Sequence, residues 1–270
     1  MPLLTLHLLS LKPGIKPESV AQSLRKAQGV EVIVASRPRG FVVRPEILDV
    51  PTLLNTKWDL LLLLRSSGNG IPADLHASFV KDEYTVHAGI PSRLLSTYPE
   101  KNARLWREAP SAPLTGALDE ARGKPSSQNL ELSPALFEFM DELVKVHDKS
   151  VTMLNLLHFH KDGKPHYYKY GQGFIPVAGK RGGDAKIVGN VVKPGPGQCD
   201  SRGDANKPED EWWNEISIVH YPSIRHFCDM LAGADYQEIN AKYRLGALRD
   251  TFLLCTTELD IEGPEYNTKL

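Results

Sequence analysis

The stretches LHLLSL (Leu6–Leu11) and LNLLHF (Leu154–Phe159) decide the fold, because one strand-like pattern is written twice in the same chain. A second apolar run that begins with tryptophan follows each of them, WDLLLLLR (Trp58–Arg65) and WNEISIVH (Trp213–His220). In each copy a helical pattern comes after the first run and another after the second. Strand, helix, two strands, helix and strand make a split βαβ unit. Two copies predict two similar half-domains packed together.

The repeat therefore predicts an α+β protein made of two fused ferredoxin-like (βαββαβ) units. We expect the first unit in residues 1–98, a linker with an added helix in 99–149, and the second unit in 150–270. The unbroken apolar run Leu60–Leu64 favours a strand that is buried on both faces, and hence a filled core in the first half. We expect the main pocket in the second half.

The connection between the halves changes character along its length. Residues 99–132 are rich in Pro, Gly, Ser and Ala, which favours a linker or a segment that wraps the first half. Ser133 is a typical N-cap and Pro134 a typical first helical residue, so a helix is expected up to Val146. Residues 194–211 hold almost no apolar side chain and predict a long loop, with a role as a lid as the alternative.

Composition is that of an ordinary globular protein, with 270 residues, 41% hydrophobic and 24% charged. The net charge of −1 favours no nucleic-acid partner. The first residues favour a strand over a signal peptide, and no apolar run is long enough to span a bilayer. Three widely spaced cysteines form neither a disulfide framework nor a metal motif. These features predict a cytoplasmic protein without a membrane partner.

A family resemblance rests on MLNLLHF, YYKYGQGF, the Trp-initiated strand that ends in YPS, and DYQ, all between residues 150 and 260. This combination resembles the dimeric α/β barrel superfamily, and is most similar to an uncharacterised small-domain family within it. The start HLLSLKPG is similar to the stress-responsive branch, which includes olivetolic acid cyclase. The resemblance implies two facing sheets, here in one chain as an intrachain α/β barrel. A homodimer is allowed but not required.

The resemblance also implies a pocket between each sheet and its own helices, with a polar residue on the first strand. His7 and Asn155 occupy these positions, and the cyclase branch has a catalytic His where His7 stands. The haem-degrading branch has an Asn at the place of Asn155. The chain lacks equivalents of the second catalytic His and of the haem-ligating His. For both residues a structural role, with satisfied hydrogen bonds, stays open beside the functional one.

Strand alternation places Asn155 on one face of its strand and His158 and His160 on the other. The two histidines could chelate a metal, and His220 could be its third ligand. The alternative is a cluster without metal, and we expect none to be bound.

Further candidates lie in the second half of the sequence. They are Tyr167, Tyr170, Tyr221 and Trp213, as pocket or core groups. Arg225, Arg244 and Arg249 favour surface or cap positions, although any of them could bind a carboxylate.

The sequence thus favours a cofactor-independent enzyme that acts on a small apolar or phenolic carbonyl compound by proton transfer, as an isomerase, cyclase or lyase. His7 or His220 would be the acid or base, with Asn155 and the Tyr170 hydroxyl at the carbonyl. Tyr167, Tyr221, His158 and Trp213 would contact the substrate. No cofactor is expected, because the chain has no G-x-G-x-x-G, P-loop, nucleophile elbow or HExxH. A non-catalytic small-ligand or stress protein and a metal-assisted enzyme are the alternatives.

Overall fold

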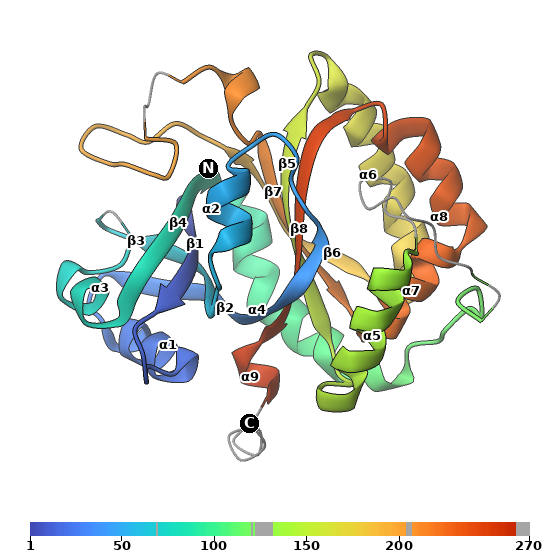
Figure 1. Cartoon of the computed structure of the whole chain (residues 1–270), viewed down its shortest axis with the longest axis horizontal. Coiled ribbons are helices and arrows are strands. Elements are labelled where there is room, and N and C mark those ends of the chain that lie inside the picture. Colours follow the sequence, from blue (N-terminus) through green and yellow to red (C-terminus); the bar gives the residue numbers. More distant parts are fainter. Residues whose placement is uncertain (69, 120, 122–131, 204–206, 263–270) are drawn as a thin grey trace.

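A computed structural model describes residues 1–68, 70–119, 121, 132–203 and 207–262 of the chain. In these residues the backbone forms a mixed α/β fold around a closed eight-stranded barrel, in the order β1-β3-β2-β8-β5-β7-β6-β4. All neighbouring strands are antiparallel. Helices lie outside the barrel, and Figure 1 shows those of the two halves on opposite sides of it.

Each half contributes four adjacent strands in the same relative order, β4-β1-β3-β2 and β8-β5-β7-β6. The first half contains β1 (Leu3–Leu11), α1 (Pro17–Lys26), β2 (Val30–Val43), α2 (Val50–Asn55), β3 (Leu60–Ser66), α3 (Ala73–Phe79) and β4 (Val80–Gly89). The second contains β5 (Val151–Phe159), α6 (Gly163–Gly179), β6 (Asp184–Val191), η2 (Glu209–Glu211), β7 (Glu215–Tyr221), α7 (Ile224–Ala232), α8 (Ala234–Ile239), η3 (Asn240–Arg244), β8 (Leu248–Glu258) and α9 (Leu259–Glu262).

The halves are joined by two unequal seams. β2 is long enough to pair with β3 through Val30–Ser36 and then with β8 through Ser36–Val43. The register of the second pairing shifts between Pro38 and Gly40, which is where a strand proline is tolerated. The opposite seam between β4 and β6 has only two residue pairs among the described residues, Ala88 with Val191 and Gly89 with Asn190.

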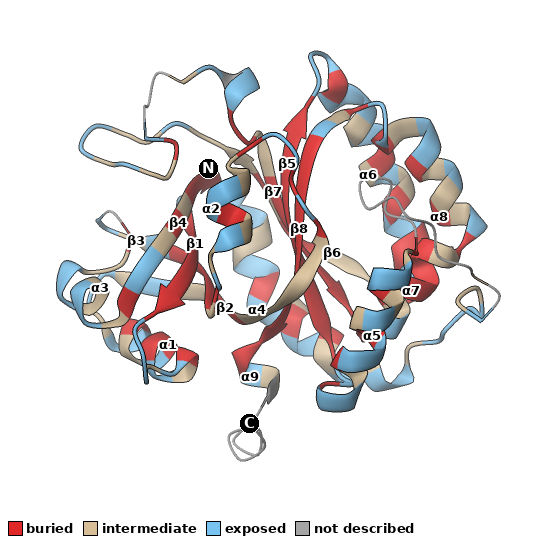
Figure 2. Cartoon of the chain, in the orientation of Figure 1, coloured by how far each residue is buried: buried red, intermediate tan, exposed pale blue. Residues whose placement is uncertain are grey.

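Strand alternation separates a filled barrel interior from the helix-covered outer faces. Leu61 and Leu63 of β3 belong to the interior cluster, whereas Leu60, Leu62 and Leu64 pack under α1. The expectation that this strand is buried on both faces is confirmed. Figure 2 shows the buried strands between helices whose outer sides are exposed. The interior is therefore a packed core, which β-barrels of this size can fill with side chains.

The connection between the halves is more regular than the sequence predicts. Residues from Ser92 to Glu108 form helix α4, followed by the short helix η1 (Ala109–Ser111). Pro99 lies inside α4, so the first part of the stretch expected to be a linker is helical. Residues 122–131 of the expected linker lie outside the described part of the chain.

α4 contributes to a polar cluster at one end of the barrel interior. Lys186 of β6 pairs with the Glu258 carboxylate of β8, and its ammonium group donates to Oδ1 of Asn102 at 2.6 Å. Asn102 in turn donates to Glu258 at 2.8 Å, and the Tyr98 hydroxyl donates to it at 3.3 Å. The fully buried lysine thus has its charge matched.

The added helix predicted between the halves is confirmed as α5 (Pro134–Val146). The Ser133 side chain accepts a hydrogen bond from the Leu136 amide, as an N-cap does. α5 packs so closely on β2 that a Cβ at Gly40 would lie 2.5 Å from the Phe139 ring. A glycine is therefore required where this helix crosses the strand.

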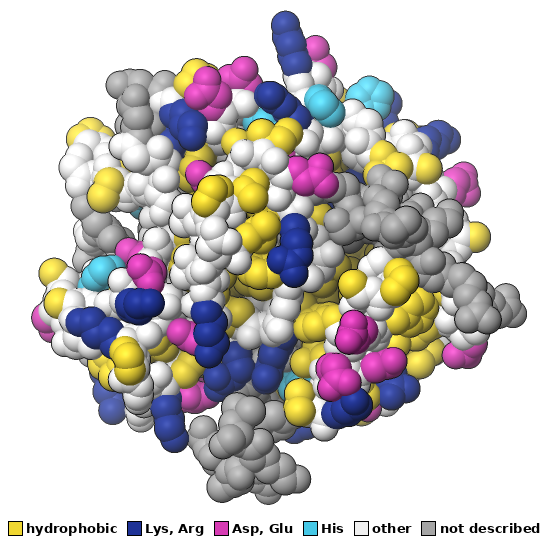
Figure 3. Space-filling model, in the orientation of Figure 1, with side chains coloured by type: hydrophobic (Ala, Val, Ile, Leu, Met, Phe, Trp, Pro, Cys, Tyr) yellow, Lys and Arg dark blue, Asp and Glu magenta, His cyan; other side chains and the backbone are white. Residues whose placement is uncertain are grey.

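In the described residues no helix is long and apolar enough to span a bilayer. Acidic and basic side chains are interspersed on the face that Figure 3 shows. The three cysteines are free, and Cys228 and Cys255 are buried.

We predict that Lys186→Met destabilises the protein by about 3–5 kcal/mol, because it leaves the Glu258 carboxylate buried without its cation. The double variant Lys186→Met/Glu258→Gln removes both charges and should recover much of that loss. Urea unfolding of the wild type, the two single variants Lys186→Met and Glu258→Gln, and the double variant measures the difference. If the double variant is as unstable as the sum of the two single ones, the pair is not what balances the barrel interior.

Candidate functional site

A cavity of about 1120 Å³ lies against the outer face of the second-half sheet, under α6 and beside α7, α8 and η3. This volume is slightly above the usual range for small-molecule pockets, about 300–1,000 Å³. The cavity is bounded mainly by apolar and aromatic side chains, which include Met153, Phe174, Val219, Phe227, Met230 and Leu253. We refer to it as the second-half cavity.

Three polar side chains stand together on the floor of the second-half cavity. Asn155 of β5 lies directly opposite Ser217 of β7, and Glu215 is two residues before Ser217 on the same face. Asn155 donates one amide hydrogen to the carbonyl of Met153 at 3.2 Å. Its side chain and that of Ser217 are largely buried, at 8% and 7% exposure. The floor thus presents an amide, a hydroxyl and a carboxyl group to one space.

Glu215 has the most unusual acid–base property of these groups. Burial raises the pKa of its carboxyl group to about 7, and the positive charge of Lys164 only partly counteracts this. A carboxyl group with this pKa is near half-ionised at neutral pH, which suits a group that both accepts and returns a proton. We did not single out Glu215 from the sequence. The two-residue alternation from Tyr221 through Val219 and Ser217 would have placed it on the cavity face.

Tyrosines form the roof and the inner wall of the cavity. Tyr167 and Tyr170 of α6 lie with ring centroids 5.2 Å apart. The Tyr170 hydroxyl donates to the Tyr236 hydroxyl at 3.3 Å. Tyr221 ends β7, and its hydroxyl lies 3.7 Å from the sulfur of Met230. Burial raises the pKa of all four phenols, so they stay protonated at neutral pH.

Arg244 completes the cavity wall from the far side. It is only 2% exposed, which corrects the expectation of a surface or cap position. Arg225 and Arg249 are exposed. Arg244 is the last residue of η3, a π-helical turn in which the amide of Leu245 bonds to the carbonyl of Asn240. Such turns are rare and often lie at functional sites.

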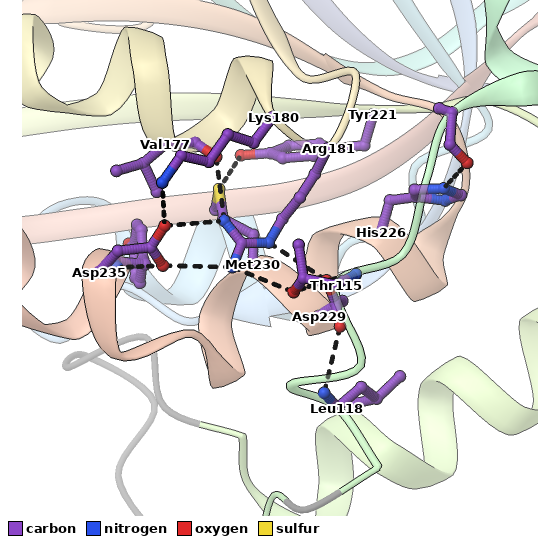
Figure 4. A network of polar contacts seen from close by, with 12 residues as sticks. Thr115, Leu118, Val177, Lys180, Arg181, Tyr221, His226, Asp229, Met230 and Asp235 are labelled. Carbon is purple, nitrogen blue, oxygen red and sulfur yellow. Dashed lines mark hydrogen bonds and ion pairs between the residues drawn. The ribbon is translucent and has the colours of Figure 1, made fainter.

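A buried ionic network fixes the helices that form the cavity wall, as Figure 4 shows. Arg181, which follows α6, donates to Asp229 of α7 at 3.1 Å and to Asp235 of α8 at 3.2 Å. Asp229 also accepts hydrogen bonds from the backbone and hydroxyl of Thr115 and from the backbone of Leu118. The helices are thereby held in one arrangement, together with the segment that follows η1.

Of the residues predicted for the site, Asn155, Tyr167, Tyr170 and Tyr221 line the second-half cavity. His220 instead points into the barrel, because it alternates with the cavity-facing residues of β7, and Trp213, which precedes β7, belongs to the barrel core. Trp213 donates to the Tyr84 hydroxyl at 2.8 Å in the barrel core. Burial lowers the pKa of His220 to about 3, and the charge of Lys186 contributes. The expected role of His220 as acid or base is therefore wrong for neutral pH.

The metal alternative is not supported by the strand register. His220 pairs with Thr152 at one end of β5, whereas His158 pairs with Asp250 at the other end. Six residues of strand separate these positions by roughly 20 Å. His158 bonds through Nδ1 to the carbonyl of Trp212 at 2.8 Å, and His160 is exposed. Within the described ranges, no group of three His, Cys, Asp or Glu side chains could hold a metal ion.

His7 lies far from these groups, on the outer face of the first half. Its Nδ1 donates to Glu83 at 2.7 Å, and Nε2 of His76 donates to the other oxygen of Glu83 at 3.1 Å. Burial would raise the pKa of Glu83, but these two histidines hold it below its usual value. A Cβ on Gly70 would come within 2.6 Å of the His7 ring, so the loop after β3 covers it closely. The structure does not bring His7 and Asn155 together.

The long polar loop does not cover the second-half cavity where it is described. The amide of Ser201 donates to the carbonyl of Thr85 in β4, and Nε2 of His87 donates to the carbonyl of Cys199 at 3.1 Å. These contacts hold residues 199–201 against the first half, on the side of the narrow seam.

No protein-family model and no curated protein matches the sequence. Among solved structures, a protein of unknown function from Rhodopseudomonas palustris is 24% identical over 47% of this chain and 93% of its own, with a TM-score of 0.35. Its methylated form gives 23% and 0.37. A "Putative monooxygenase" from Fusobacterium nucleatum is 8% identical, covers 96% and 92% of the two chains, and has a TM-score of 0.48. Likenesses at this distance carry no conclusion about the activity of this chain.

We predict a pH-dependent gain of stability for Glu215→Gln. The folded protein binds a proton at Glu215 more tightly than the unfolded chain, so stability is lost as pH rises through the window from about 4.5 to about 7. The variant has no such loss. Relative to wild type it should be about 1–3 kcal/mol more stable at pH 8 and nearly unchanged at pH 4.

Urea unfolding at both pH values measures this difference, with Glu138→Gln on the exposed side of α5 as the control. An equal effect of Glu215→Gln at pH 4 and pH 8 would show that the carboxyl group titrates normally in the folded protein.

Proposed function

We propose that this chain is an enzyme that moves a proton within a small aromatic or apolar carbonyl compound bound in the second-half cavity. The observation that carries the proposal is the placement of Glu215, a carboxyl group in the floor of a large apolar cavity, on the face it shares with Asn155 and Ser217. Enolisation needs at least one group that accepts and returns a proton and, beside it, uncharged hydrogen-bond donors for the carbonyl oxygen.

In the proposed reaction the Glu215 carboxylate takes a proton from the carbon next to the carbonyl. The electron pair of that C–H bond forms the C=C bond of the enolate, and the negative charge moves to the carbonyl oxygen. The Ser217 hydroxyl and the second amide hydrogen of Asn155 donate to that oxygen. Glu215 then returns the proton to a different atom, which completes an isomerisation without redox change. In this scheme Glu215 has the role first expected of a histidine.

The apolar surroundings of the polar floor residues favour this proton transfer. The tyrosine and phenylalanine rings of the wall are largely apolar, and such surroundings strengthen each hydrogen bond to the developing charge. The rings also suit a flat, aromatic substrate, because offset and edge contacts between rings are favourable.

A binding protein without activity is the second candidate. The largely apolar lining of the cavity favours it, because such a cavity holds a ligand with few polar contacts. The same ligand would then bind without any exchange of its protons.

We also propose that each half is a ferredoxin-like unit and that the chain contains two of them, residues 1–98 and 150–270. The equal strand order in the two halves and the placement of α1 and α6 after the first strand of each support this. In such an arrangement the second unit has kept an open space under its first helix, whereas the described side chains of α1 pack directly on the first sheet.

We predict that the protein accelerates exchange of the methylene protons of 4-hydroxyphenylacetone or of 4-hydroxyphenylpyruvate in D₂O. Glu215→Gln should lower the accelerated rate by about 10²–10⁴-fold, because the base is lost while the cavity keeps its shape. Proton NMR follows the exchange, and Glu138→Gln should behave as wild type. Binding of a probe without accelerated exchange would favour the non-catalytic candidate instead.

We further predict that Asn155→Ala weakens binding of an exchanging probe by about five- to tenfold, as expected for one lost hydrogen bond. His7→Ala should leave the affinity unchanged, because His7 lies on the first half. Isothermal titration calorimetry gives both affinities, with far-UV circular dichroism to establish that each variant is folded. The reverse pattern would place the site in the first half.

A further inference from the structure

The second-half cavity is longer than a small ketone requires. Its floor follows one face of β7, where the cavity is bordered by Glu215, Ser217, Val219 and Tyr221. The extended strand covers roughly 20 Å between the first and the last of these residues. The roof follows α6 from Lys164 to Gly179, and a helical stretch of this length spans roughly 22 Å. The floor and the roof thus give nearly the same length.

The strand and the helix run side by side in the same direction. At one end Lys164 donates to Asn190, which pairs with Glu215 in the register of β6 and β7. At the other end Gly183 follows α6 after a short turn, and a Cβ on it would lie 3.3 Å from the Tyr221 ring. The cavity is therefore an elongated space with Glu215 at one end and Tyr221 at the other.

Polar and apolar groups occupy different parts of this length. Asn155 and Ser217 face each other across β5 and β7, two residues along β7 from Glu215. Two residues further on, the facing pair is Met153 with Val219, and both border the cavity. A ligand whose carbonyl group lies at Asn155 and Ser217 therefore has an apolar floor beyond it.

The far part of the cavity, from Val219 to Tyr221, offers apolar and aromatic contacts. The ring centroids of Tyr221 and Phe227 lie 5.1 Å apart. The Tyr221 hydroxyl lies 3.7 Å from the sulfur of Met230, so this tyrosine offers a ligand mainly its ring. Methionine side chains are flexible and adapt to apolar groups of varied shape. This part of the cavity suits a flexible apolar chain.

The charged groups near the far end interact within the protein. Lys101 donates to Asp184 at 3.1 Å, and Asp184 pairs with His220, the residue before Tyr221. Arg244 also borders the cavity and takes part in an interaction within the protein. An uncharged ligand chain therefore fits this part of the cavity without a charge of its own.

We infer that the ligand of the second-half cavity carries an unbranched apolar chain that extends from its carbonyl group over Val219 to Tyr221. This inference rests on the proposed function, because it names the substrate class of the same cavity. The floor from Ser217 to Tyr221 covers roughly 13 Å, and an extended nonyl chain has about this length. The substrate class is thus a long-chain, uncharged carbonyl compound.

The test uses three ketones that differ only in chain length, methyl propyl, methyl hexyl and methyl nonyl ketone. Each methylene group that leaves water for apolar surroundings should tighten binding about two- to fourfold. Equilibrium dialysis with the wild-type protein should therefore give about tenfold or more tighter binding at each step of the series. Proton NMR in D₂O follows the exchange of the protons beside the carbonyl group in the same ketones.

Ala185→Leu fills space that the chain needs. Ala185 lies on β6 opposite Val219 and borders the cavity, so a leucine narrows the cavity beyond Ser217. The variant should lower the ratio of the methyl nonyl ketone affinity to the methyl propyl ketone affinity by about tenfold or more. Ala73→Leu adds the same side chain at an exposed site on α3 and should keep the wild-type ratio. Ala185→Val takes its place if far-UV circular dichroism shows that Ala185→Leu does not fold.

The outcomes separate this inference from the proposed function. If affinity does not rise from methyl propyl to methyl nonyl ketone, or if it rises equally in a folded Ala185→Leu, the inference is overturned. Glu215-dependent exchange of methyl propyl ketone would then leave the proposed function standing. Chain-dependent binding that Ala185→Leu reduces, without exchange of any ketone, would support the chain site in a non-catalytic binding protein and overturn the proposed function.

Discussion

The structure depends on the continuity of β2 across the boundary between the halves. One half of this strand completes the first sheet and the other half pairs with β8. A single strand that pairs with both sheets holds them in a fixed relation, which the two residue pairs of the opposite seam could not do alone. Closure by β2 also leaves no free sheet edge at this seam. The barrel interior then becomes a core shared by both halves.

A filled interior leaves only the outer faces for function, and the two halves treat those faces differently. On the first half, leucines of β1 and β3 meet Val20, Ala21 and Leu24 of α1, and the face is closed. On the second half, α6 places tyrosines over a floor that carries Asn155 and Ser217. Large aromatic rings that rest against α7 and α8 leave space between the helix and the sheet. Small aliphatic side chains in direct contact with the sheet do not leave such space. The two halves therefore differ in the side chains on their outer faces and not in the order of their strands.

The sequence predicted the strands and some of the cavity residues. The alternation of side chains along a strand explains both the correct predictions and the errors. Two apolar repeats with tryptophan-initiated partners predicted strands that build the barrel. Counting in twos separated Asn155 from His158 and His160, and the family resemblance placed Asn155 at a pocket. The same count along β7 from Tyr221 excludes His220 and selects Glu215, but a histidine attracts a mechanistic role more readily than a glutamate. Arg244 was beyond reach, because no sequence pattern announces a π-helical turn or the burial of one arginine among three.

The acid–base property of Glu215 depends on which charges act on it in the second-half cavity. A guanidinium close to Glu215 would favour its ionised form, and its pKa would not rise to about 7. The carboxyl group instead experiences mainly its burial and the distant pull of exposed Lys164. An anionic group bound beside Glu215 would raise that pKa further, so less of the carboxyl group would be ionised at neutral pH and proton removal would slow. The proposed proton transfer therefore favours a ligand that places an uncharged carbonyl group, and not an anion, against Glu215.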